Sequence, residues 1–220
     1  ALASKINDTL INFNKNNLQS FNSSFRHSQV TRLIDDTDDA ITSNITKVVL
    51  AKFFTPTLNE EVGYTLFFNN RIFNPHARHN SDQGGVTAST GFKVSGDTAN
   101  EHFFDDDGNG NIRRYFVLAG VKNYIDNTAG TIDYALGTIS INPINITSVS
   151  DVDGSSSTQI RVTAIPDSFD IVPVRNQILE IDLENTSITT SIDTTEVGDV
   201  NVASSSQLAT SSTTSIASGY

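Results

Sequence analysis

The residues best suited to chemistry lie in one short segment, residues 105–116, with the sequence DDDGNGNIRRYF. Side-chain oxygens recur there at every second position, a spacing that can place them around one cation. Ca²⁺ takes about six to eight such oxygen ligands. Gly110 stands where the calcium loop of an EF-hand turns sharply, and Ile112 takes the usual apolar position. The candidate calcium ligands are Asp105, Asp107, Asn109 and Asn111.

The same segment also fits an ordinary β-hairpin turn. Its twelfth position is Phe116, where an EF-hand loop carries a bidentate glutamate, and Arg113 and Arg114 bring positive charge. The flanking runs HFF and RRYFVL are typical of strands rather than helices. Turns favour Asp, Asn and Gly for their own backbone bonds and left-handed conformations. A calcium-stabilised surface or adhesion domain therefore stays open beside a hairpin that needs no cofactor.

Two other polar clusters have a weaker claim to a ligand. Residues 34–40, IDDTDDA, carry four carboxylates, but such a run is typical of a solvated turn or the start of a short helix. His76 and His79 could share a metal, yet no Cys or Glu stands near them, and a solvated loop is favoured. The chain has no nucleophile-elbow, Walker or HExxH motif. We therefore expect that the protein is not an enzyme.

Composition excludes several classes of partner. The formal net charge of −11 and the scattered basic residues predict no nucleic-acid surface. No apolar run approaches the roughly 20 residues of a membrane span, so we expect no membrane partner. The absence of Cys excludes disulfides and thiolate metal sites. The 220 residues suffice for one large domain or one and a half smaller ones.

Residues 4–25 predict one long N-terminal helix. Apolar residues recur at helical spacing with one slip, and Ser4 can cap the start. Many Asn residues weaken the helix, because Asn favours caps and turns. A marginal helix needs a surface to pack on, either the chain's own β domain or another subunit. The candidate partner-binding residues are Ile6, Leu10, Phe13, Leu18, Phe21 and Phe25.

Most of the remaining chain predicts short β-strands separated by turns. A turn at residues 135–137 is expected to reverse the chain, so that residues 131–134 pair with residues 138–141. We expect a mainly β fold of sandwich-like antiparallel sheets with an N-terminal α-helix, or else an α+β fold. The other predicted strands are residues 44–56, 64–68, 92–94, 112–118, 144–149, 159–165 and 177–183.

The last twenty residues differ in character from the rest. Half of them are Ser or Thr, and their isolated apolar residues cannot bury enough area to fold alone. The sequence therefore predicts three segments. Residues 1–43 form a helical junction, residues 44–185 a β domain, and residues 186–220 an extended Ser/Thr-rich tail that is flexible or ordered by a partner.

Several short strings, taken in their order and spacing, resemble the large ring-forming baseplate wedge protein of T-even-type contractile-tailed phages. The resemblance runs from residue 20 to residue 183. The strings are FRHS at 25–28, IDD at 34–36, NITKVVLAKFFTP at 44–56, the DDDGxGNIR turn at 105–113, GTIDYxxG at 130–137 and RNQIL at 175–179.

This resemblance implies a structural protein of the virion tail baseplate, assembled in the host cytoplasm. In that family, paired copies join neighbouring wedges into a ring around the tail hub, and the ring rearranges when the sheath contracts. The resemblance also implies self-association, as a dimer or through ring contacts, and binding to other baseplate wedge proteins. It corresponds to the C-terminal portion of a longer protein, in keeping with a first residue that is Ala1 rather than Met.

Overall fold

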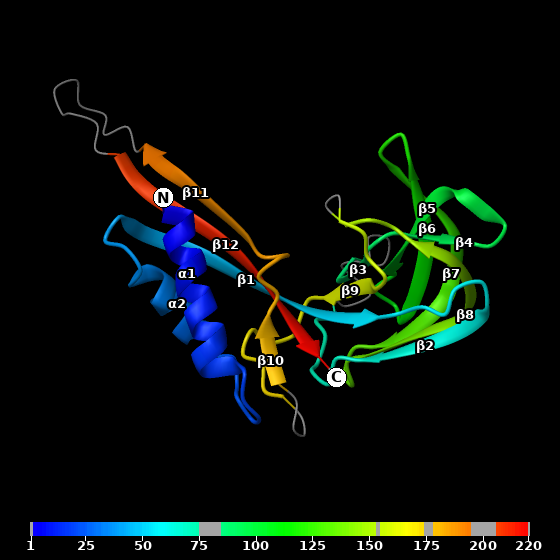
Figure 1. The fold of residues 1–220 in the computed structure, drawn as a ribbon, viewed down its shortest axis with the longest axis horizontal. Helices are drawn as coiled ribbons and strands as arrows, with labels where there is room; N and C mark the ends of the chain where they lie inside the picture. The colour runs from blue at the N-terminus through cyan, green and yellow to red at the C-terminus, as the bar shows by residue number, and fades with distance from the viewer. Residues whose placement is uncertain (1, 75–84, 153–154, 174–177, 195–205, 220) are drawn as a thin grey trace. The chain divides into compact units, whose positions relative to one another are not determined.

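A computed structural model describes residues 2–74, 85–152, 155–173, 178–194 and 206–219, with side chains up to residue 191 (Figure 1). The chain divides into two compact units. Unit 1 combines residues 1–49 with residues 169–218, and unit 2 is formed by residues 50–168. The described residues confirm a mainly β, antiparallel chain that begins with a helix.

The helix expected over residues 4–25 ends early, at a π-helical turn, and a second helix follows beyond residue 25. Helix α1 spans Leu2–Phe13, the π-helix η1 spans Asn14–Leu18, and helix α2 spans His27–Asp35. In η1 the Gln19 amide bonds to the Asn14 carbonyl, five residues back, at 3.2 Å. The buried Asn14 side chain then accepts a bond from the Ile181 amide at 2.9 Å. Asn-rich sequence ends the regular helix because the Asn side chain serves another backbone segment.

In unit 1 these helices pack against a small sheet. Strand β12 (Ser206–Gly219) lies between β10 (Ile178–Ile181) and β1 (Ile41–Phe54), and β11 (Ser187–Thr194) pairs antiparallel with β12. Helix α1 packs against α2 and β11. The segment expected as a Ser/Thr-rich tail therefore contributes two strands to unit 1.

Unit 2 is built from the end of β1 and eight further strands. Five of them pair in the order β5, β4, β8, β7, β6, and β6 pairs with β5 again, so the pairings close into a ring rather than forming two stacked sheets. Strands β3, β9 and the end of β1 extend from β5, while β2 pairs with β8. The strands are β2 (Glu61–Phe67), β3 (Thr87–Ser89), β4 (Phe92–Val94), β5 (Asp97–Asp106), β6 (Asn111–Leu118), β7 (Val121–Asp133), β8 (Thr138–Val149) and β9 (Ile160–Ala164).

Apolar side chains fill the core of unit 2. Ring closure removes most exposed strand edges, and alternation along each strand turns one set of side chains to the buried side. Phe92 and Phe104 lie with ring centroids 4.7 Å apart. The other fully or nearly fully buried members include Ile112, Ile132, Ile139, Ile141, Ile146 and Val162.

The two turns singled out in the sequence both reverse antiparallel strands. Strands β5 and β6 join through residues 107–110, with Asp106 opposite Ile112. Strands β7 and β8 join through residues 134–137, with Asp133 opposite Thr138, as predicted. Strand β8 runs through both strands expected at 138–149. A register shift in β2 between Val62 and Tyr64 accommodates Pro143 there, which has no amide to donate.

Among the described glycines, Gly137 combines a left-handed φ with a very close approach to another backbone segment. Its φ is +65°, and a Cβ there would stand 1.9 Å from the Asn70 carbonyl oxygen. Gly120 also has a positive φ, +80°, but a Cβ there meets nothing within 4 Å.

We expect Gly137→Ala to lower the free energy of unfolding by roughly 3 kcal/mol or more, because the backbone must move. Gly120→Ala is the matched control and should cost only about 1 kcal/mol of left-handed strain. Urea unfolding followed by circular dichroism measures both. Equal losses in the two variants would contradict a tight approach at Gly137.

Candidate functional site

The three consecutive carboxylates at the β5–β6 turn point to three different places. Asp105 is 1% exposed and is bound on the outer side of the ring. Its Oδ1 accepts from Arg113 Nε at 3.0 Å, and its Oδ2 accepts from Lys122 Nζ at 2.8 Å and Tyr124 Oη at 2.9 Å. Asp105 thus joins three strands, β5, β6 and β7.

Aromatic rings cover the two cations that hold Asp105. The Arg113 guanidinium lies 4.2 Å from the centre of the Tyr124 ring, and Lys122 Nζ lies 4.3 Å from the centre of the Tyr115 ring. Tyr115 in turn stacks on Phe103, with centroids 5.6 Å apart. Because a buried charge needs partners to offset its desolvation, this set is a complete structural ion cluster.

Asp106 faces the opposite way and is 0% exposed. Its Oδ1 accepts from the Thr87 amide at 2.8 Å and the Thr87 hydroxyl at 3.1 Å, and its Oδ2 accepts from Tyr134 Oη at 2.8 Å. Burial, together with the Asp106 charge, raises the pKa of Tyr134, so its hydroxyl stays a donor. Asp106 therefore ties β3 to the β7–β8 turn.

Asp107 binds its own loop. Its Oδ1 accepts from the amides of Asn109 and Asn111, at 2.7 and 3.0 Å, and its Oδ2 from Asn111 Nδ2 at 2.7 Å. Gly108 and Gly110 have φ of +78° and +103°, as a tight turn requires. Of the four candidate calcium ligands, Asp105 and Asp107 thus accept hydrogen bonds from the hairpin strands and the loop. No described group of three His, Asp or Glu is placed to hold a metal.

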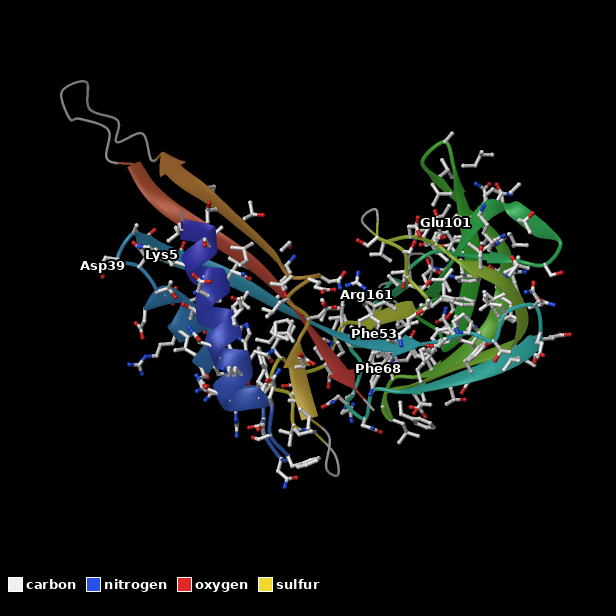
Figure 2. The ribbon with its side chains drawn as sticks, in the orientation of Figure 1. Lys5, Asp39, Phe53, Phe68, Glu101 and Arg161 are labelled. Carbon is white, nitrogen blue, oxygen red and sulfur yellow. The ribbon has the colours of Figure 1, made fainter. Side chains whose placement is uncertain are left out.

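The acidic cluster at residues 34–40 lies at the end of helix α2, not at the start of a helix. Carboxylates are unfavourable at that end of the helix dipole, and two cations offset them. Lys5 Nζ, labelled in Figure 2, lies 2.6 Å from Asp38 Oδ2, and Arg32 Nε lies 3.4 Å from Asp36 Oδ2. His76 and His79 fall outside the described residues, as does much of the RNQIL string.

The candidate partner-binding stripe is mostly buried within unit 1 itself. Phe13 meets Phe25 edge-on with centroids 6.3 Å apart. Of the six residues, only Phe21 is exposed, at 65%. The buried members are Ile6, Leu10, Phe13, Leu18 and Phe25. The stripe therefore packs on the chain's own β structure, and Phe21 alone stays open to a partner.

Hydrogen bonds of the FRHS string join the N-terminal part of unit 1 to its C-terminal part. Phe25 and Ile171 exchange two backbone bonds of 2.9 Å. The Asp170 carboxylate accepts from the His27 amide at 2.9 Å and from Arg26 Nη1 at 3.2 Å. The His27 amide and Arg26 lower the pKa of Asp170. No local sequence pattern predicts that residues 170 and 171 are the partners of this string.

The segments joined by these contacts each carry an exposed apolar side chain. Gln19 Nε2 donates to Glu180 Oε1 at 3.3 Å, which places the residue 19–24 turn beside β10. Phe21 is 65% exposed, Val172 57% and Ile178 38%. We call Phe21, Val172 and Ile178 the apolar end of unit 1.

One histidine is enclosed by the ring of unit 2. His102 is 0% exposed, with its ring centroid 6.3 Å from that of Phe92 and 6.2 Å from that of Phe116. Its Nε2 lies 3.2 Å from Asp97 Oδ2, but neither ring nitrogen is aligned for a hydrogen bond with a described residue. Burial and the Arg114 charge lower the pKa of His102 against the opposing effect of Asp97.

If the Asp105–Asn111 loop needs no cation, calcium should leave stability unchanged. A ligand that binds only the folded chain must raise its melting temperature. We expect equal melting temperatures in millimolar calcium and in chelator, with magnesium as the control for ionic strength. A melting temperature that rises with calcium but not with magnesium would show that the loop binds calcium. The contacts of Arg113 and Lys122 with Asp105 would then have to rearrange.

The neutral state of His102 predicts a stability loss in mild acid. An unfolded His has a pKa of about 6.5, and the folded pKa lies below it, so the unfolded state takes up the proton first. Wild-type stability should therefore fall as the pH drops below about 6.5. His102→Phe should lose less free energy of unfolding between about pH 7 and about pH 5, as measured by urea midpoints. Identical losses would show that His102 does not contribute.

Comparison with known proteins found one family. Residues 1–52 match the family model described as baseplate structural protein gp6, C-terminal domain III. No curated protein and no solved structure matched the chain. The matched segment contains the FRHS and IDD strings and the start of β1, whereas the strings at 105–113, 130–137 and 175–179 lie outside it.

The part of the chain that the structure describes also contains no helix both long and apolar enough to cross a membrane. The segment that forms α1, η1, α2 and most of β1 is thus similar to domain III of a phage baseplate structural protein, which indicates a structural protein located in the tail baseplate of a virion.

Proposed function

We propose that this chain is a wedge subunit of a contractile-tail baseplate, which acts by associating with a second copy of itself and with other wedge proteins. The match of residues 1–52 to a baseplate structural domain carries this proposal. The proposed function requires neither catalysis nor a cofactor. The carboxylates at the β5–β6 turn accept hydrogen bonds from the chain's own donors.

The apolar end of unit 1 supports a contact with a second copy. Two copies that each carry a net charge of −11 repel one another over most of their surfaces. Phe21, Val172 and Ile178 are uncharged, and the adjacent Arg26 and Asp170 neutralise each other. Burying exposed apolar area at such a place gains about 25 cal/mol per Å² without bringing carboxylates together.

Light scattering across a concentration series tests the self-association. The wild-type mass should rise from monomer towards dimer, and Phe21→Ser should weaken the dimer by at least about tenfold, since a large exposed aromatic is lost. Ile45→Ser is a matched control, because Ile45 is 66% exposed but lies in β1.

Circular dichroism checks that both variants stay folded. A wild-type chain that is monomeric at every concentration would contradict self-association. An unchanged dimer in Phe21→Ser would move the contact away from the apolar end.

A further inference from the structure

The β6–β7 hairpin ends in a projecting apolar tip. Strand β5 pairs with β6 only as far as Phe116, and β8 pairs with β7 only at residues 130–133. Among the described residues, the strand partners of residues 117–125 therefore all lie within the β6–β7 hairpin itself. Figure 1 shows this hairpin in green, extending away from the ring. We call residues 117–125 the arm.

The arm exposes aliphatic side chains where turns usually carry polar ones. Val117 is 49% exposed, Leu118 62%, Val121 63% and Ile125 47%. Leu118 lies directly opposite Val121, so the two form one apolar tip. Single exposed apolar residues are ordinary, but a facing apolar pair such as Leu118 and Val121 at the tip of a projecting element is typical of an interaction site.

The arm is also held in a defined conformation. Ala119 and Gly120 have φ of +51° and +80°, the pattern of a type I′ turn that matches the twist of a hairpin. At its base, Lys122 and Tyr124 are both bonded to the buried Asp105. A pre-organised element loses little conformational entropy on binding, which favours association.

The positive charge of the β6–β7 hairpin indicates which partner the arm would bind. No carboxylate occurs from residue 108 to residue 125, whereas Arg113, Arg114 and Lys122 all do. Asp105, which binds both Arg113 and Lys122, offsets only one of these three positive charges, and Lys122 remains 45% exposed. The whole chain has a net charge of −11, so a second copy presents the opposite sign to the arm. We propose that the arm is a docking element that inserts its apolar tip, Leu118 and Val121, against a second copy of this chain.

This inference rests on the proposed self-association and names a surface for it that is separate from the apolar end of unit 1. The chain contains no Trp, so Leu118→Trp places a single indole reporter at the tip while keeping it apolar. Leu136→Trp is the matched control, because Leu136 is 68% exposed at the opposite end of β7.

The test measures mass and tryptophan emission on the same samples across a concentration series. We expect the emission of Trp at 118 to shift to the blue as the mass rises, and that of Trp at 136 to stay constant. A rise in mass without a shift at 118 overturns the arm contact and leaves self-association standing. A mass that never rises overturns both. A shift that appears only on adding phosphatidylglycerol vesicles assigns the tip to lipid and overturns the proposal.

A variant with serine at both tip positions, Leu118→Ser with Val121→Ser, provides the second measurement. It should raise the dissociation constant of the assembly at least about tenfold, whereas Leu136→Ser should not change it. Both substitutions are exposed, and circular dichroism verifies the fold. Added salt should weaken the wild-type assembly, because it screens the attraction between the positively charged residues of the hairpin and a negatively charged partner. Equal dissociation constants for the wild type and the tip variant contradict the proposal.

Discussion

Unit 2 depends on two adjacent buried carboxylates that point in opposite directions. Strand alternation sends Asp105 to one side of β5 and Asp106 to the other. Asp105 binds β6 and β7 through Arg113, Lys122 and Tyr124, while Asp106 binds β3 and Tyr134. Removing one member of such a set leaves a buried charge unpaired, which typically costs about 3–5 kcal/mol. Asp105 and Asp106 together thus anchor the ring, strand β3 and the arm.

Unit 1 uses polar contacts in a comparable way. Asn14 holds β10 by its Ile181 amide, and Asp170 holds the start of α2 by the His27 amide. Each contact joins residues that are more than a hundred positions apart in sequence. Apolar burial stabilises the helices on the sheet, whereas these few directed bonds select which chain segments become neighbours.

Local patterns were sufficient to predict the elements whose apolar residues alternate or surround a glycine turn. The β7–β8 reversal and the strands β1, β2, β4, β6, β9 and β10 belong to this group. Strand β5 was missed because two of its buried residues are aspartates, whose partners are distant in sequence. The first half of β7 was missed because the arm exposes both faces, so that no alternation marks it.

The candidate site was predicted only in part, for the same physical reason. Oxygen spacing in the Asp105–Asn111 loop indicates a cation, but it cannot reveal that Arg113, Lys122 and backbone amides also donate to these carboxylates. Helical spacing was sufficient to locate an apolar stripe, of which all but Phe21 is buried, but a sequence cannot state which surface covers it. Strands β11 and β12 carry little apolar signal, since their pairing is made by backbone groups that every residue possesses.

The composition of unit 1 from both ends of the chain sets an order for biosynthesis. Residues 50–168 are contiguous, so the ring can close while the ribosome is still adding the rest. The first part of β1 must wait, because its neighbour β12 follows the ring strands in the sequence. Translation therefore delays completion of the segment similar to the baseplate domain until β12 has been made, and a polypeptide interrupted before β12 would contain a complete ring without a complete unit 1.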